Sequence, residues 1–252
     1  MKSALTYKDI VFKSYADHPE LYQGDQGVLL RIAYKNNKVW WRRLFERNKY
    51  VLYQPGAVYD GANEFVKETF RALDYLKAGT LFKIVSAVND TKRVVLIKKG
   101  RVGDDHFLNK RRIILYHPQS GMRLVDNATD SKGKPEYNLT GERQSSALGL
   151  LHELGHAYVN IYLSKQEKEI LHKKDRWYSV KEERFVIEQI ESVMANVLGE
   201  DPRFNNGGEI LRTKDVLSLK KARIIRARIG FYWFRKKKRN AVQILIHQLN
   251  SE

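Results

Sequence analysis

The segment from Ser145 to Leu163 constrains the fold of this chain more than any other part of the sequence. Glu153 is its only Asp, Glu, Lys or Arg residue, and apolar side chains would lie on every side of a helix formed there. A helix that is apolar all round is a buried helix. We therefore expect a central, buried helix, with Ser145 or Ser146 as its N-cap.

Inside this segment, His152, Glu153 and His156 form the pattern H-E-x-x-H. Histidines four residues apart lie one turn apart on the same face of a helix, so both imidazole rings can reach one metal ion. The glutamate beside them can take a proton from a metal-activated water, as in zinc hydrolases. Burying these polar groups is costly unless something compensates them, and a zinc ion would do so. The alternative is a core helix whose polar groups have ordinary hydrogen-bond partners.

The composition limits the kinds of site and of partner. The 252 residues include no cysteine, so any metal must be bound by His, Asp or Glu. The formal net charge of +17 favours contact with nucleic acid, an anionic membrane or cell-wall polymer, or an acidic protein, without choosing among them. No apolar run is long enough to be a transmembrane segment, and the first eight residues lack the apolar part of a signal peptide.

Apolar periodicity and turn residues predict the elements around the central helix. Strands are expected at 27–34, 93–97 and 112–116, a partner for the first strand at 39–45, and helices at 62–77, 80–88 and 181–198. Residues 119–144 are polar and have no clear period, so we expect a loop there that could build a substrate-binding wall. Residues 164–178 are expected to be a lysine-rich connection, and Gly199 to end the last helix.

A catalytic zinc ion needs a third protein ligand and an open position. One class of sites continues the motif as H-x-x-G-x-x-H, but Val159 replaces the glycine and Tyr162 the histidine, which excludes that class. His172 follows in the lysine-rich segment and is a poor candidate. In the helix at 181–198 the apolar residues form one stripe, and Glu183 falls near its centre, so its carboxylate should face the interior.

Other acidic residues of that helix compete with this interpretation. Glu182 and Glu191 fall on opposite edges of the stripe, and Glu188 points further out. Glu183 could also simply place a negative charge at the helix N-terminus, where the helix dipole favours it. We predict Glu183 as the third ligand, with Glu191 as the second choice or as a partner that orients a histidine.

With these residues assembled, the chain resembles a zinc metallopeptidase of the glutamate-ligand (gluzincin) type. More narrowly, it is similar to bacterial secreted effector metallopeptidases related to type III effectors that cleave host signalling kinases, and to domains at the ends of large bacterial toxins. The resemblance covers residues 112–208 and rests on Tyr116-His117-Pro118, His152–Ala157, Glu182-Glu183, Glu191-Ser192 and Gly199–Arg203. Ser192 departs from the family, which has Asn after the later glutamate.

The resemblance implies zinc-dependent peptide hydrolysis, with zinc bound by His152, His156 and Glu183, and with Glu153 as general base. It also implies an α+β fold: a zincin-like, mainly helical catalytic core with a small sheet before the H-E-x-x-H helix. The expected regions are an N-terminal subdomain of unknown role (1–63), a metallopeptidase-like domain (64–210) and a basic aromatic C-terminal segment (211–252).

The same resemblance suggests a biological setting and further roles. An oxyanion donor is needed, for which Tyr158 and Arg203 are candidates. The substrate would be a protein or peptide, and the chain would be an effector or toxin made in the cytoplasm without a signal peptide and exported by a specialised secretion system. A small acidic immunity or inhibitor protein would suit a toxin of this positive charge.

Two other functions fit parts of the sequence. A regulatory metallopeptidase that cleaves a repressor would use the same zinc motif, although no helix-turn-helix module is visible in the sequence. A non-enzymatic protein could bind nucleic acid or an anionic surface through the tail, where Phe231–Phe234 precede Arg235–Arg239. That tail is also compatible with a solvated helix beside a small packing cluster. Zinc content separates the enzyme from the pure binding protein.

Overall fold

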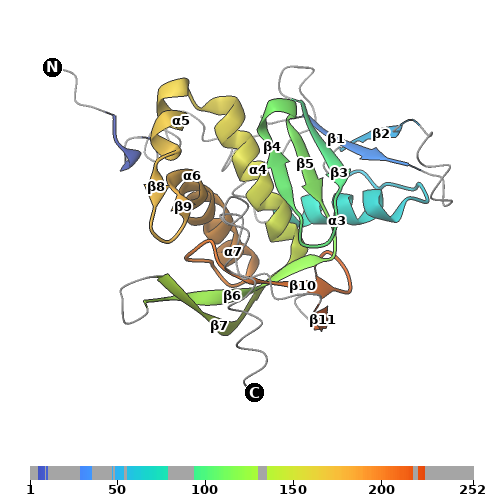
Figure 1. Ribbon diagram of the computed structural model, residues 1–252. Helices are drawn as coiled ribbons and strands as arrows, with labels where there is room; N and C mark the ends of the chain where they lie inside the picture. Colours follow the sequence, from blue (N-terminus) through green and yellow to red (C-terminus); the bar gives the residue numbers. More distant parts are fainter. Residues whose placement is uncertain are drawn as a thin grey trace.

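The computed structural model describes residues 5–8, 10, 29–35, 47, 49–53, 56–78, 94–129, 135–217 and 221–224. The strand predicted at 39–45, the helix predicted at 80–88 and the basic aromatic tail from residue 225 onward lie outside these residues. Within them the chain is a mixed α/β protein with two larger sheets (Figure 1), which agrees with the predicted α+β class.

The first sheet contains the three strands that the sequence predicted. Its order is β2-β1-β3-β5-β4, formed by β1 (Leu29–Tyr34), β2 (Lys49–Leu52), β3 (Val94–Lys99), β4 (His106–Leu108) and β5 (Ile113–Tyr116). Parallel pairing joins β1, β3 and β5, whereas β2 and β4 are antiparallel edge strands. Because β1 and β3 are paired, the region boundary expected at residue 63 falls between strands of one sheet. With five strands among the described residues, this sheet is larger than the small sheet that was expected before the H-E-x-x-H helix.

Two helices pack against this sheet and against each other. Helix α3 (Glu64–Ala78) was predicted from the apolar residues Phe65, Phe70, Leu73 and Leu76, all of which are buried. Helix α4 (Ser146–Tyr162) carries the H-E-x-x-H motif and is buried along most of its length, as predicted. Ser145 is its N-cap and accepts a hydrogen bond from the Leu148 backbone N–H.

The predicted acidic helix is continuous from residue 181 to residue 198, but it is not a regular α-helix. It consists of α6 (Lys181–Phe185), the π-helical stretch η4 (Val186–Glu191) and α7 (Ser192–Leu198). Gly199 ends it in the left-handed conformation with φ 72°, as predicted. In Figure 1, α4 lies between this helix and the first sheet, and it contacts η4 directly.

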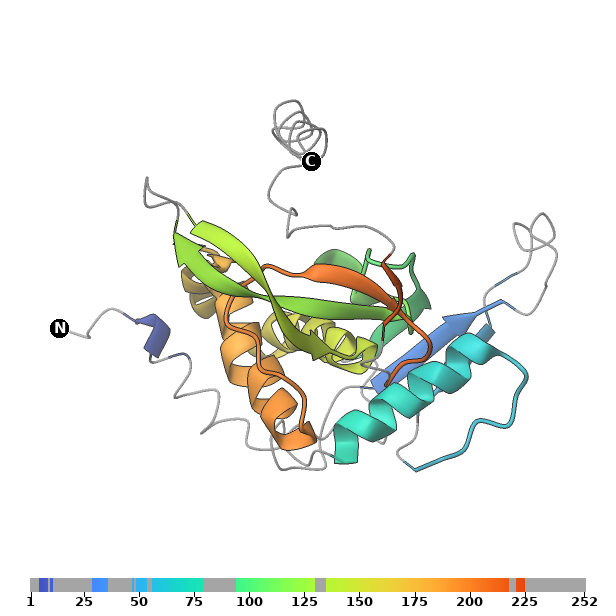
Figure 2. The same ribbon diagram turned by 90° about the horizontal axis from the view of Figure 1, so that it is seen from below.

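The prediction of a loop at 119–144 is wrong, because these residues form a β-hairpin. Strands β6 (Ser120–Thr129) and β7 (Pro135–Gln144) pair with β10 (Glu209–Thr213) and β11 (Lys221–Ile224) in a second sheet of order β11-β10-β6-β7. The register shifts between Arg123 and Val125, so that Leu124 and Val125 are buried in succession. This irregularity removes the alternation of apolar and polar residues that would identify a strand. Figure 2 shows this sheet lying across the molecule next to α4.

The lysine-rich connection at 164–178 also has structure that was not predicted. It contains α5 (Lys165–Leu171), followed by a small hairpin of β8 (Lys174–Asp175) and β9 (Ser179–Val180). Ser164 and Glu167 form a capping box at the start of α5, a signal that the sequence contains as S-x-x-E. Within the described part of the chain, no helix is both long and apolar enough to cross a membrane.

Candidate metal centre

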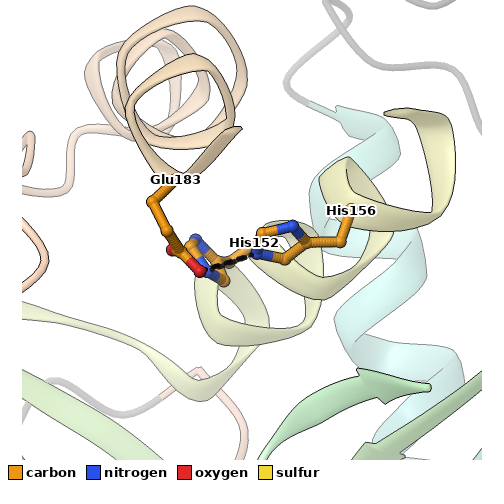
Figure 3. A group of neighbouring side chains, drawn as sticks. All are labelled: His152, His156 and Glu183. Carbon is orange, nitrogen blue, oxygen red and sulfur yellow. Dashed lines mark hydrogen bonds and ion pairs between the residues drawn. The ribbon is translucent and has the colours of Figure 1, made fainter. Parts of the chain in front are cut away.

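His152 and His156 on α4 and Glu183 on α6 bring their polar atoms to one point, as Figure 3 shows. The two Nε2 atoms are 3.2 Å apart, and Glu183 places one carboxylate oxygen 3.3 Å from His152 Nε2 and the other 3.4 Å from His156 Nε2. This is the trio that the sequence predicted. We call these three residues the ligand trio.

The spacing in the ligand trio fits a zinc ion. Zinc binds histidine nitrogen and carboxylate oxygen at about 2.0–2.2 Å, with its ligands at the corners of a tetrahedron. Two such ligand atoms are then roughly 3.3–3.5 Å apart, because a tetrahedron's edge is about 1.6 times the distance from its centre to a corner. The observed separations of 3.2–3.4 Å lie close to this range, with a different oxygen of the Glu183 carboxylate next to each ring.

The outer nitrogen of each imidazole contacts a second carboxylate. His152 Nδ1 is 2.7 Å from Glu191 Oε2, and His156 Nδ1 is 2.8 Å from Glu182 Oε1. A carboxylate only accepts hydrogen bonds, so both Nδ1 atoms carry protons, and the neutral form of each ring would direct its Nε2 lone pair toward the other ring. Two lone pairs at 3.2 Å repel unless a positive charge lies between them, which either a proton or a metal ion can supply. The tautomers therefore suit metal binding.

The ionisation of the ligand trio also favours a bound cation. Burial alone would lower the pKa of His152, but Glu183 and Glu191 outweigh burial and raise the pKa to about 9. Burial likewise opposes the charge of His156, yet Glu183 and Glu182 raise its pKa well above the usual value. Burial would raise the pKa of Glu183, but His156 and His152 lower it well below the usual range. The carboxylates thus favour a positive charge at the point where the two imidazole rings approach each other.

Glu153 lies beside the ligand trio and does not belong to it. It is 7% exposed and lines a cavity of about 430 Å³ that the trio also lines. Burial raises the pKa of the Glu153 carboxyl, although His152 and His156 act in the opposite direction. A carboxylate whose pKa is raised toward neutrality is a better proton acceptor for water.

No family model, curated protein or solved structure matches the chain. The interpretation of the site therefore depends on the chemistry of its own residues.

Glu191 was predicted as a second choice of ligand or as a partner that orients a histidine. It contacts His152 Nδ1 and is not in the ligand trio, which agrees with the orienting role. It is 1% exposed, and burial would raise its pKa, but Arg203 and His152 lower it. The Arg203 guanidinium is 3.4 Å from Glu191 Oε2 and also donates to the backbone oxygen of Asn205. The Ser192 hydroxyl donates to the Arg203 carbonyl and accepts from the Arg203 backbone N–H, so it fixes the backbone of this arginine.

Three other residues singled out in the sequence lie outside the ligand trio, among them His172, as predicted. Tyr158 is buried in the core, where its ring stacks on Phe185, and it does not line the cavity, so it is poorly placed as an oxyanion donor. Arg203 lines the cavity but its guanidinium is directed at Glu191. The His172 side chain is 62% exposed, lies 3.4 Å from Glu182, and is not in the ligand trio.

Sequence reasoning missed three residues of the site. Glu182 was placed at an edge of the helix stripe, yet it contacts His156. Asp105 and His106, at the start of β4, line the cavity, and the carbonyl of Asp104 accepts a hydrogen bond from His106 Nδ1 at 2.8 Å. The available signals were the Glu182-Glu183 pair and the polar triplet 104–106 before a short strand.

Proposed function

We propose that this protein is a zinc-dependent peptide hydrolase. The observation that carries the proposal is the convergence of His152, His156 and Glu183 at the spacing of zinc ligands, with Glu153 in the same cavity. The ordered carboxylates behind both rings support it, because ligand histidines usually donate their other N–H to a carboxylate or a carbonyl.

Each residue has a role that follows from its chemistry. The ligand trio would hold a zinc ion, which would supply a Lewis acid for water and for the peptide carbonyl. Glu153 accepts a proton from the attacking water and passes it to the leaving amine. Glu182 and Glu191 keep the imidazole rings in the tautomer that offers Nε2, and Arg203 keeps Glu191 ionised.

The finer parts of the proposal are the gluzincin type and the secreted effector or toxin role. The mixed sheet before α4 and the glutamate of the ligand trio on α6 support the zincin-like arrangement. The effector role is supported only by the resemblance in the sequence, as are export by a secretion system and an acidic inhibitor protein.

Metal analysis and peptide cleavage test the proposal. We expect about one zinc per purified chain, and almost none in His152→Ala. Glu153→Gln should keep its zinc and lose cleavage of a fluorogenic peptide library by about 10²–10⁴-fold, because only the proton acceptor is removed. Glu169→Gln, an exposed residue of α5, is the control for a lost carboxylate and should match the wild type.

Two results would overturn the proposal. Equal cleavage by wild type and Glu153→Gln would show that the activity comes from elsewhere. A zinc-free chain that binds DNA or anionic vesicles in a salt-dependent manner would support the non-enzymatic binding protein instead.

A further inference from the structure

The cavity extends from the ligand trio along the start of β4 and the start of β6. Beyond the trio its wall includes Gly103, Asp105, Ser120 and Gly121. This part of the cavity adjoins the ligand trio and Glu153, which would perform the reaction. A substrate side chain adjacent to the scissile bond could therefore enter it.

The lining of this cavity is strongly acidic, although the chain as a whole is strongly basic. Its five carboxylates belong to Asp105, Glu153, Glu182, Glu183 and Glu191. Among the described residues of the lining, Arg203 is the only Lys or Arg, and its guanidinium faces Glu191. With both imidazoles neutral and all five carboxyl groups ionised, a divalent ion and Arg203 together would offset three of the five negative charges. The remaining charge favours a cationic group from the substrate.

Asp105 is the carboxylate of this set that the proposed reaction does not use. Its Oδ1 accepts a hydrogen bond of 2.8 Å from the His117 backbone N–H, and Ser120 donates to it as well. A carboxylate has about four acceptor positions, so it can accept further donors. Burial, followed by the negative charge of Glu153, raises the Asp105 pKa well above its usual value. No Lys or Arg of the described chain forms an ion pair with Asp105, and a substrate cation beside this carboxyl group would favour its ionised form.

Small residues leave room next to Asp105. Gly149 lies one helical turn before Glu153 on α4, and a methyl group added there would be 4.0 Å from Asp105 Oδ2 and 3.8 Å from the Ser120 carbonyl. Gly103 and Gly121 line the same cavity. At Gly149, therefore, no side chain fills the space next to the Asp105 carboxylate.

We propose that this cavity selects substrates with a lysine or arginine next to the scissile bond, whose cationic end pairs with Asp105. The inference rests on the proposed hydrolase function and specifies its substrate class. Lysine and arginine combine a long apolar stem with a terminal cation that donates several hydrogen bonds. Such a side chain matches a cavity whose wall includes a carboxyl group that has no cationic partner among the residues that the structure describes.

Binding of uncleavable ligands tests the selection separately from catalysis. Short peptide hydroxamates would carry lysine, norleucine or glutamate at the position nearest the hydroxamate, in one series for each side of the scissile bond. For the zinc-loaded wild type, calorimetry should show in one series that the lysine hydroxamate has a Kd at least about tenfold lower than that of the norleucine hydroxamate. Glutamate should bind more weakly than both.

The variant Asp105→Asn keeps the shape and the acceptor for His117 but removes the charge. We expect its lysine preference to fall to within about threefold of unity, while norleucine binding stays unchanged. Asp126→Asn, an exposed aspartate on β6, is the matched control and should retain the wild-type preference. Gly149→Ala serves as a second variant, because it narrows the space without changing a charge and should weaken lysine binding more than binding of a glycine hydroxamate.

The outcomes separate this inference from the proposed function. A zinc-loaded wild type that binds the hydroxamates without preferring lysine in either series overturns the inference and leaves the hydrolase proposal standing. A preference that is equally strong in Asp105→Asn also overturns it. A chain without zinc fails the proposed function itself, and the substrate class fails with it. The same lysine-to-norleucine ratio should appear in kcat/KM for peptide cleavage.

Discussion

Each imidazole of the ligand trio is oriented by a carboxylate, and the two carboxylates are secured differently. Glu191 is 1% exposed and is bound on its other side by Arg203. Glu182 is closer to solvent, and its other oxygen faces His172 at 3.4 Å. Both carboxylates fix the proton on Nδ1, so each should contribute to metal affinity without contacting the ion.

Replacing Glu182 tests this contribution. We expect Glu182→Gln to weaken zinc binding by about 10–100-fold, because an amide is a weaker acceptor and no longer fixes the His156 tautomer. Competition with a chromogenic chelator measures the zinc Kd. Glu169→Gln is the control, and a zinc Kd equal in Glu182→Gln and wild type would contradict the orienting role.

His117 should make the stability depend on pH below neutrality. Burial, with help from Lys99 and Arg212, lowers its pKa from 6.5 to about 4, and its Nδ1 accepts the Gln119 backbone N–H. As pH falls below 6.5, the unfolded chain takes up a proton on this ring before the folded chain does. The stability from the neutral ring is therefore present above pH 6.5 and is lost as pH falls to about 4.

The variant His117→Asn isolates this contribution, because its Oδ1 can replace Nδ1 as an acceptor and does not titrate. When the pH is lowered from 6.5 to 4, the free energy of unfolding measured in urea should fall by about 1–3 kcal/mol more for the wild type than for the variant. Parallel losses in both proteins would show that His117 keeps its ordinary pKa in the fold.

At the scale of elements, the contact between α4 and η4 determines the geometry of the centre. Gly155 lies at this contact, where a methyl group would be 2.7 Å from Val186 Cγ1 and 3.3 Å from Ile190 Cδ1. The close approach lets Glu183 and Glu191, from the second helix, reach the two histidines.

A matched pair of glycine variants tests this contact. Gly155→Ala should destabilise the fold by about 1–3 kcal/mol, because overpacking against Val186 outweighs the gain in helix propensity. Gly149→Ala, in the same helix, meets only contacts of 3.8 and 4.0 Å and should be neutral or stabilising by up to about 1 kcal/mol. Chemical unfolding measures both, and equal effects would mean that the α4–η4 contact can relax.

The elements also show which parts of the structure the sequence could predict. The parallel strands and α3, α4 and the 181–198 helix follow from apolar periodicity, and the ligand trio follows from helical spacing. The hairpin 120–144 was missed because an irregularity between Arg123 and Val125 breaks the alternation. Glu191 was placed off the ligand face because a regular helical wheel does not apply across η4. Asp105 and His106 were missed because their positions depend on pairing between β4 and β5.

At the scale of the whole molecule, the proposed ion would join parts of the chain that otherwise meet through packing. The ligand trio connects α4 with α6, and Arg203 connects Glu191 with the loop that follows α7. Asn205 of that loop donates to the Val125 carbonyl of β6. Metal binding should therefore stabilise the fold beyond the immediate site.

Removing zinc tests this coupling. Zinc held at about 100 times its Kd should add roughly 2.7 kcal/mol to the free energy of unfolding, because the unfolded chain lacks the assembled trio. Thermal unfolding with zinc and with excess chelator should differ by several degrees. His152→Ala should unfold at one temperature under both conditions, and a zinc-dependent shift in that variant would place the stabilising ion elsewhere.

The π-helical stretch has a consequence for how relatives of this chain can be found. Each hydrogen-bonded π turn contains one residue more than an α turn. Glu183 and Glu191 are eight positions apart in the sequence, but the extra residue places them as if they were about seven positions apart in a regular α-helix. They are then roughly 20° apart around the helix axis and share one face. A chain with one residue fewer between these glutamates would present both on an uninterrupted α-helix. A search pattern for such centres should accept either gap length.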